Sequence, residues 1–226
     1  MTPEDRLVLE MFGEGKTDVG VGAEPGPPTS GVVPILVYKL CGKPKQMVVK
    51  RKRIPFLQEP ELKKSKRLWR KIEFAKRRAA ASGSAGVVFV VHSEGGRKEH
   101  RKLKGDLEKG RESVRPDFPM AIGVAQPCIE SWLLADAPAI RRAMDLPTTP
   151  EVPGKPEELP APHQDRMHNP KTELAKATGT TKKEVSVKEK DGIATAINDL
   201  NALRTRCPLG FAPFADEVDQ RIRPLF

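Results

Sequence analysis

The sequence feature that most constrains the fold is an uninterrupted apolar run, Val87-Val88-Phe89-Val90-Val91, made almost entirely of β-branched residues. Such a run is typical of a central strand that is buried on both faces of a parallel sheet. A turn rich in Gly and Ser precedes the run, and the polar turn His92-Ser93-Glu94-Gly95-Gly96 follows it. The run therefore predicts a layered α/β protein built around one deeply buried strand.

Three other apolar runs predict further strands: Leu7 to Phe12, Gln46 to Val49 and Met120 to Gln126. Helical spacing of apolar residues predicts a helix at Glu61 to Ala81. Helix is also expected near Val32 to Leu40, and Arg97 to about Val114 is interpreted as a polar helical crossover between two strands. The intervening stretch Gly20 to Ser30 is too rich in Gly and Pro for a continuous helix. Because strands that alternate with helices favour parallel pairing, we predict an α/β fold with a parallel central sheet and helices on both faces.

The second half of the chain predicts mainly helices. Ile129 to Met144 is predicted as one helix with Trp132, Leu133 and Ile140 inward, and the Pro-rich stretch Pro147 to Pro170 as a surface loop or an insertion. The helical C-terminal part, 171–226, is predicted to hold helices near Lys171 to Thr178, Lys188 to Arg206 and Phe211 to Ile222. The length of 226 residues suits one domain spanning 1–226.

The chain is strongly basic, with 40 Lys and Arg against 30 Asp and Glu and a formal charge of +10. Such a balance favours a phosphate-rich partner such as nucleic acid, although solubility alone also explains it. Much of the excess lies in Lys43 to Arg53 and in Lys63 to Arg78, where Trp69 and Phe74 are interpreted as core residues. The candidate nucleic-acid contacts are Lys16, Arg51, Arg53, Arg67, Arg70 and Arg97.

The three cysteines, Cys41, Cys128 and Cys207, are far apart and form no C-x-x-C pair, which argues against a disulfide framework or a zinc knuckle. The first residues lack a basic segment followed by an apolar one, and no stretch approaches the roughly 20 apolar residues of a membrane span. We therefore expect a cytoplasmic protein that is not embedded in a membrane.

Acidic residues follow three of the predicted strands. Glu14 and Asp18 come after the first, Glu94 after the central strand and Glu130 after the last. Because the carboxyl ends of parallel strands line one crevice, these side chains are expected to lie together and to bind a divalent cation, Mg²⁺ or Mn²⁺. For any single acid, a solvated or helix-capping role is the simpler reading.

The segment Gly15-Lys16-Thr17 invites comparison with a nucleotide-binding P-loop. That motif, G-x-x-x-x-G-K-[ST], requires a glycine five residues before Gly15, and this position is Glu10, within the predicted strand. The remaining loop is too short to wrap around phosphates. Lys16 can still contact a phosphate as a point charge.

Taken together, these motifs resemble the Toprim-like proteins, specifically a bacterial family of unknown function related to the overcoming-lysogenization-defect nucleases. The resemblance rests on Glu14-Gly15-x-Thr17-Asp18 after the first strand, on Ser93-Glu94-Gly95 after the central strand, and on Glu130-Ser131-Trp132-Leu133-Leu134-Ala135-Asp136. Asn169-Pro170-Lys171 and the closing Cys207-Pro208-Leu209-x-Phe211-x-x-Phe214 also fit, so the resemblance spans most of the chain.

The resemblance implies a Toprim-like fold in which Glu14 is a metal ligand or general acid/base and Asp18 a second acid. The family pattern ends the central strand in Asp-x-Asp, whereas this chain has His92-Ser93-Glu94. An imidazole suits manganese, iron or zinc better than magnesium, so this departure bears on the choice of metal and on activity.

The function expected from these residues is metal-dependent cleavage of DNA or RNA, with Glu14, Glu94 and Glu130 as catalytic groups and Glu14, Asp18, His92, Glu94 and Glu130 as metal ligands. The resemblance alone adds a role in phage defence and an ATPase partner subunit. The alternative is a catalytically degenerate Toprim-like module that binds nucleic acid or a partner. A small-molecule phosphotransfer enzyme is a third reading, with no nucleotide loop to support it.

Overall fold

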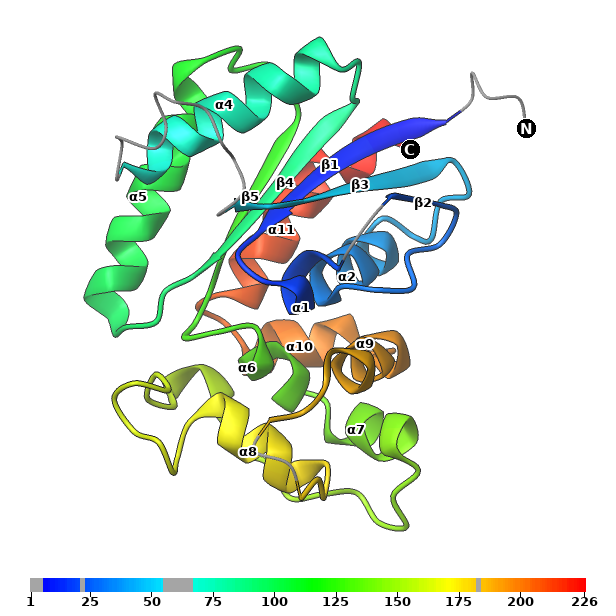
Figure 1. The fold of residues 1–226 in the computed structure, drawn as a ribbon, viewed down its shortest axis with the longest axis vertical. Coiled ribbons are helices and arrows are strands. Elements are labelled where there is room, and N and C mark those ends of the chain that lie inside the picture. The colour runs from blue at the N-terminus through cyan, green and yellow to red at the C-terminus, as the bar shows by residue number, and fades with distance from the viewer. Residues whose placement is uncertain (1–5, 21–22, 55–66, 182–183) are drawn as a thin grey trace.

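The computed structural model describes residues 6–20, 23–54, 67–181 and 184–226, which form an α/β fold around a five-stranded sheet of order β2-β3-β1-β4-β5 (Figure 1). Four strands run parallel: β1 (Leu7–Gly13), β3 (Met47–Arg53), β4 (Gly86–His92) and β5 (Met120–Ala125). The short strand β2 (Ala23–Pro25) pairs antiparallel with β3 at one edge. The predicted layered α/β class is confirmed.

Helices cover both faces of this sheet (Figure 1). Helices α4 (Leu68–Ala81) and α5 (Arg97–Ser113) bury Ile72 and Leu107 against one face, where Phe12 stacks on Phe89 with ring centroids 5.7 Å apart. Helices α2 (Val32–Leu40) and α11 (Phe211–Arg221) lie on the other face. As expected for a strand buried on both faces, the apolar run of β4 is at most 1 % exposed.

A group of shorter helices lies beyond the carboxyl ends of the parallel strands (Figure 1). These are α1 (Lys16–Val19), α6 (Glu130–Leu134), α7 (Ala137–Met144), α8 (Pro170–Ala177), α9 (Val187–Ala196) and α10 (Leu200–Arg206). Trp132 of α6 is fully buried, stacked on Phe214 and edge-on to Phe211, each at 5.4 Å between ring centroids. Two 3₁₀ turns, Pro156–Glu158 and Arg223–Leu225, complete the described elements.

The structure corrects several boundaries. The predicted strand Gln46 to Val49 is β3, which runs on to Arg53, so the basic run 50–53 belongs to the sheet and pairs with β1. The predicted helix Ile129 to Met144 is two helices, since Asp136 accepts a hydrogen bond from the N–H of Ala139 and begins α7. Lys188 to Arg206 is likewise divided into α9 and α10, with Asp199 as the N-cap of α10. Residues 61–66 of the predicted helix Glu61 to Ala81 lie outside the described residues.

The Pro-rich stretch is not simply a surface loop. Glu157 within it is buried and accepts hydrogen bonds from the backbone N–H groups of Leu209, Gly210 and Phe211, at the start of α11. Arg206 donates to the carbonyl oxygens of Ala135 and Pro153, which also fastens this stretch to the helical part. The loop is therefore a strap that joins α11 to the helices beyond the sheet.

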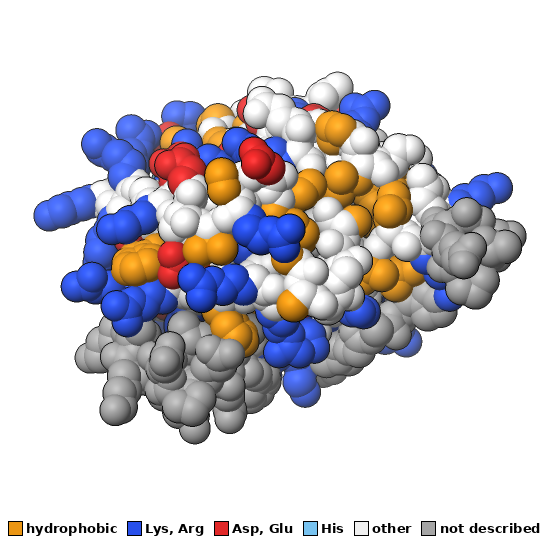
Figure 2. Space-filling model, turned by 90° about the horizontal axis from the view of Figure 1, so that it is seen from above, with side chains coloured by type: hydrophobic (Ala, Val, Ile, Leu, Met, Phe, Trp, Pro, Cys, Tyr) orange, Lys and Arg blue, Asp and Glu red, His pale blue; other side chains and the backbone are white. Residues whose placement is uncertain are grey.

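Lys and Arg side chains gather on the side of α4 and α5 (Figure 2). Trp69, interpreted from sequence as core, is only half-buried there, with Arg70 and Lys109 over its ring at 5.3 and 5.0 Å from the centroid. Phe74 is half-buried and packs against the core beneath α4. Among the helices of the described residues, none is long and apolar enough to cross a membrane.

Candidate site at the carboxyl ends of the strands

Glu14 and Asp18 are placed by the turn after β1. Gly13 allows a close approach there, because a Cβ atom at Gly13 would lie 2.8 Å from the Cβ of Asp18. Oδ2 of Asp18 accepts a hydrogen bond of 2.8 Å from the N–H of Gly15, which leaves Oδ1 free to face the neighbouring strand. Asp18 is buried, whereas the Glu14 side chain is 41 % exposed.

His92, the last residue of β4, lies between these two carboxylates. Its Nε2 is 3.2 Å from Oδ1 of Asp18 and its Nδ1 is 3.8 Å from Oε2 of Glu14. Burial alone lowers the pKa of His92, but the contact with Asp18 and the charges of Asp18, Glu14 and Glu130 outweigh it and raise the pKa to about 9. The ring is therefore an imidazolium at neutral pH, held by two acids from the adjacent strand end.

Glu94 and Glu130 are placed by the turns that follow β4 and β5, and these turns are hydrogen-bonded to each other. Ser93 Oγ donates to Oε1 of Gln126 at 2.6 Å, and Gln126 Nε2 donates to the carbonyl oxygen of Gly95 at 3.0 Å. Glu94 itself has a left-handed backbone with φ of 45° and an exposed side chain. This coupling keeps the two acidic turns at the same edge of the sheet.

Glu130 is buried and ion-paired. Its Oε1 lies 2.7 Å from Nζ of Lys190 in α9, and both side chains are at most 6 % exposed. Burial raises the pKa of Glu130, but the charge and hydrogen bond of Lys190, together with the charge of His92, lower it to about 2. Glu130 is thus ionised at neutral pH, with Oε1 engaged by Lys190 and Oε2 buried without a hydrogen-bond partner among the described residues.

The pKa of Glu14 is raised above its usual value. Burial is the largest cause, and the negative charges of Asp18 and Glu94 add to it, while His92 opposes the rise. The three carboxylates are therefore close enough to repel one another. This excess of negative charge is the chemical condition under which a divalent cation is stabilising, and their oxygens are the ligands that Mg²⁺ and Mn²⁺ take.

The carboxylates of Glu14 and Glu94 reach solvent at this edge, and the carboxylate of Asp18 is buried behind them. Within the described residues, no three His, Cys, Asp or Glu side chains are already grouped as metal ligands. Binding a metal would therefore require side chains such as Glu14 and Glu94 to turn, since Oε1 of Glu130 is engaged by Lys190 and His92 lies between two acids.

The candidate nucleic-acid contacts are scattered around the molecule. Lys16 and Arg97 are exposed and lie next to the acidic turns, whereas Arg67 and Arg70 are exposed at the start of α4. Arg51 is buried, 8 % exposed, in the middle of β3, which leaves it little surface for a ligand, and Arg53 at the end of β3 is half-buried.

Sequence reasoning missed the residues of α9 that hold the site. Lys190 pairs with Glu130, and Oδ1 of the next residue, Asp191, accepts a hydrogen bond of 2.9 Å from the N–H of Gly31. Gly31 has φ of 82° and packs so closely on α1 that a Cβ atom would lie 2.4 Å from the carbonyl carbon of Val19. In the sequence, only the adjacent charges of Lys190 and Asp191 could have indicated this role, and such charge pairs are common on exposed helices.

No protein-family model, curated protein sequence or solved structure matches this chain.

Proposed function

We propose that the protein is a metal-dependent nuclease that hydrolyses phosphodiester bonds in DNA or RNA. The observation that carries the proposal is the gathering of Glu14, Asp18 and His92 at the carboxyl ends of two neighbouring parallel strands, with Glu94 and Glu130 on the coupled turns beside them. Ligands of open α/β sheets bind at this edge.

In this proposal, the acidic residues hold the cation and the basic residues bind the phosphates of the substrate. Glu14 and Glu94 hold the cation, which when bound stabilises negative charge on phosphoryl oxygens. Asp18 fixes His92, and His92 offers a positive charge to the substrate phosphate beside Glu14. Lys16 and Arg97, exposed next to the acidic turns, bind neighbouring phosphates of the backbone.

The test is cleavage of plasmid DNA and of RNA with Mn²⁺ or Mg²⁺. We expect Glu14→Gln and Glu94→Gln each to reduce the rate at least a hundredfold, whereas Glu151→Gln, at an exposed glutamate away from the site, leaves it unchanged. Cleavage that survives both substitutions, or a wild-type protein that binds no Mn²⁺ in paramagnetic resonance titrations, contradicts the proposal.

The second candidate is a catalytically degenerate module that binds nucleic acid or a partner. The position of His92 favours it, because an imidazolium between Asp18 and Glu14 supplies the positive charge that a metal would otherwise bring. Such a module shifts DNA in a gel, weakens with salt and is indifferent to Glu14→Gln.

A cytoplasmic location, phage defence and an ATPase partner subunit belong to the same proposal. The location is supported by the three cysteines, which are all free and buried. Defence and the ATPase partner rest on the Toprim-like resemblance.

A further inference from the structure

Glu94 has a backbone conformation that residues with a side chain rarely adopt, with φ of 45°. Among the described residues other than glycine, Lys43, Arg115 and Asp145 also have positive φ. These three follow the last turns of α2, α5 and α7, where a left-handed residue commonly ends a helix. Glu94 instead comes two residues after the end of β4, so the ending of a helix does not explain its conformation.

Two glycines stand next to Glu94 and could take the left-handed position at little cost. Gly95 and Gly96 follow it directly, yet neither has a positive φ. A left-handed backbone brings the Cβ atom of glutamate close to the following carbonyl oxygen, a steric cost that glycine avoids. The turn therefore places its strain on the residue that carries the carboxylate, and strained residues of this kind cluster at functional sites.

The side chain of Gln126, the residue after β5, is hydrogen-bonded on both sides of Glu94. Its Oε1 accepts a hydrogen bond of 2.6 Å from Oγ of Ser93, and its Nε2 donates one of 3.0 Å to the carbonyl oxygen of Gly95. The N–H of Glu94 itself donates to the carbonyl oxygen of Pro127 at 3.1 Å. The backbone of Glu94 is therefore fixed at three points, all of them bonded to the turn that follows β5.

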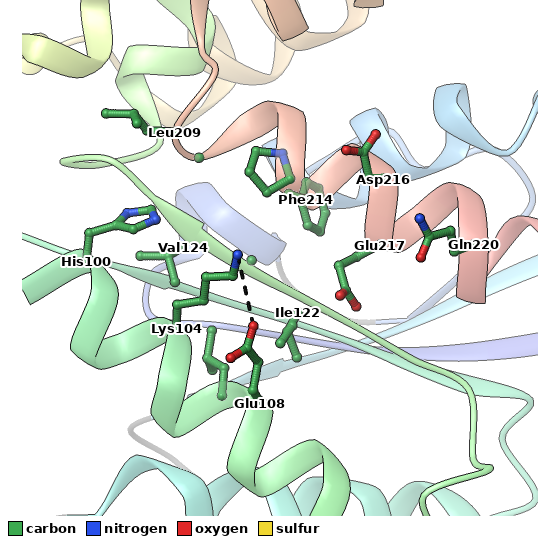
Figure 3. Close-up of a pocket in the computed structure, with 14 residues that line it drawn as sticks. His100, Lys104, Glu108, Ile122, Val124, Leu209, Phe214, Asp216, Glu217 and Gln220 are labelled. Atoms are coloured by element: carbon green, nitrogen blue, oxygen red, sulfur yellow. Dashed lines mark ion pairs between the residues drawn. The ribbon is translucent and has the colours of Figure 1, made fainter. Parts of the chain in front are cut away.

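His100 supports Gln126 from helix α5. Figure 3 shows the imidazole of His100 pointing from α5 toward the end of β5 near Val124, where it lines a cavity of about 220 Å³ between α5 and α11. Burial lowers the pKa of His100, and a hydrogen bond with the side chain of Gln126 opposes this decrease. Gln126 is only 5 % exposed and contacts both α5 and the turn after β4, which limits the movement of its own side chain.

The exposed side chain of Glu94 lies within electrostatic reach of two other elements at the strand ends. Burial is the main cause of the raised pKa of Glu14, and the charge of Glu94 adds to it. Burial lowers the pKa of Lys171 at the start of α8, but the charges of Glu130, Glu184 and Glu94 outweigh it and raise this pKa. Glu94 is therefore directed into the space between the turn after β1 and the helices beyond the sheet.

We propose that Gln126 is a positioning residue, which holds the turn 93–95 so that Glu94 keeps its left-handed backbone and presents its carboxylate beside Glu14. Gln126 itself contacts neither cation nor substrate, and it acts through its hydrogen bonds to Ser93 and Gly95. This inference rests on the proposed function, because the position of Glu94 matters for a cation that Glu14 and Glu94 share. Residues that orient metal ligands in this way contribute strongly to metal affinity.

The backbone strain is tested by thermal unfolding without metal. Glu94→Gly should unfold about 2–4 °C above Glu94→Gln, because both substitutions remove the charge and only glycine relieves a left-handed backbone. Arg115→Gly and Arg115→Gln, at an exposed residue with φ of 44°, are the matched control pair and should differ by a similar amount. In the background of Gln126→Met, which keeps the side-chain length without the hydrogen bonds, the difference between the two Glu94 variants should fall by at least half.

The positioning of the carboxylate is tested by the affinity for Mn²⁺ in paramagnetic resonance titrations. Gln126→Met and Glu94→Gln should each weaken binding about tenfold or more, and the double variant should bind no more weakly than Glu94→Gln alone. Ser93→Ala, which removes only the bond of 2.6 Å, should cause a smaller loss and replaces Gln126→Met if that variant does not fold. Arg115→Gly should bind Mn²⁺ like the wild-type protein.

Two results overturn the inference. One is an equal unfolding temperature of Glu94→Gly and Glu94→Gln, and the other is a loss of Mn²⁺ affinity in the double variant that is the sum of the two single losses. A wild-type protein that binds no Mn²⁺ contradicts the proposed nuclease instead. The thermal measurements then decide the role of Gln126 alone, and a difference between the Glu94 variants that persists in Gln126→Met refutes it.

Discussion

At the scale of single residues, the environment of His92 sets a pH dependence of stability. Its pKa in the folded protein is about 9, against 6.5 as the ordinary value, so the protonated ring favours the folded state. The stabilisation is complete below pH 6.5 and disappears as the pH rises through 9.

We expect His92→Gln to remove this pH dependence. The wild-type protein should exceed the variant in free energy of unfolding by about 2–3 kcal/mol at pH 6, and the difference should shrink towards pH 9.5. Urea unfolding at several pH values measures it, with His163→Gln at an exposed histidine as the control. A difference that stays constant with pH contradicts the assigned ion pairs.

Residue by residue, the sequence located the acids but not their partners. Glu14, Asp18 and His92 could be placed together because each follows an apolar run, and the ends of adjacent parallel strands meet. Lys190 could not be found, because its contact with Glu130 joins residues 60 positions apart and leaves no local pattern. The burial of Arg51 was missed since alternation within β3 is hidden by its basic composition.

At the scale of elements, the Lys190–Glu130 pair fastens α9 to α6. Removing one partner of a buried ion pair leaves an uncompensated charge, which typically costs about 3–5 kcal/mol. We expect Lys190→Met to lower the free energy of unfolding by this amount, and the double variant with Glu130→Met to recover most of it. Denaturant unfolding of the four proteins of this cycle measures the coupling, and purely additive effects would argue against the pair.

The same pair predicts sensitivity to acid. The pKa of Glu130 is about 2 in the folded protein, below the ordinary value of 4.5, so its contribution is present above pH 4.5 and is lost as the pH falls towards 2. In Lys190→Met the carboxyl is buried without its main cation, and its pKa should rise. Acid unfolding of the two proteins followed by circular dichroism measures the change.

Glu157 fastens the Pro-rich strap to α11. Its carboxylate accepts three backbone N–H groups, and bonds to charged groups are each worth about 1.5–3 kcal/mol. Glu157→Ala should therefore lower the free energy of unfolding by about 3 kcal/mol or more, whereas Glu158→Ala, next in sequence but 49 % exposed, should change it by less than about 0.5 kcal/mol. Equal effects of the two substitutions would show that contacts other than the hydrogen bonds of Glu157 hold the Pro-rich stretch against α11.

Elements themselves were predicted well where apolar periodicity was long, as in α4, or where an apolar run was continuous, as in β4, and α5 was predicted as the polar crossover that follows β4. The errors arose where a single side chain ends one helix and begins the next. Asp136 and Asp199 each cap a new helix, and helical spacing of apolar residues continues across both breaks, which is why one long helix was predicted in each place. Glu157 was missed because prolines around it indicate a surface loop, and only the tertiary structure brings α11 to it.

For the whole molecule, the layered α/β class followed from the order of strands and helices, because parallel strands require crossovers and these cover both faces. The antiparallel edge strand β2 was not predicted, as three residues give too short a pattern. The net charge of +10 also belongs to this scale, and it bears on nucleic-acid binding.

If nucleic acid is the partner, its affinity should fall linearly with salt on logarithmic axes, with a slope of about −0.9 for each phosphate neutralised on duplex DNA. Arg70→Ala and Arg97→Ala, at exposed positions on α4 and α5, should each reduce the slope by about one. Arg204→Ala should leave it unchanged, because the Arg204 side chain is only 25 % exposed and is held by both Asp216 and Asp219, whereas Arg97 is 71 % exposed and makes one looser contact of 3.8 Å with Glu158. Arg70 and Arg97 lie near the starts of different helices. Equal reductions of the slope in the two variants therefore indicate that the bound nucleic acid contacts a surface running from the strand ends across the basic face. If only Arg97→Ala reduces the slope, the contact is confined to the acidic turns. If neither substitution changes the slope, nucleic acid does not bind through this face.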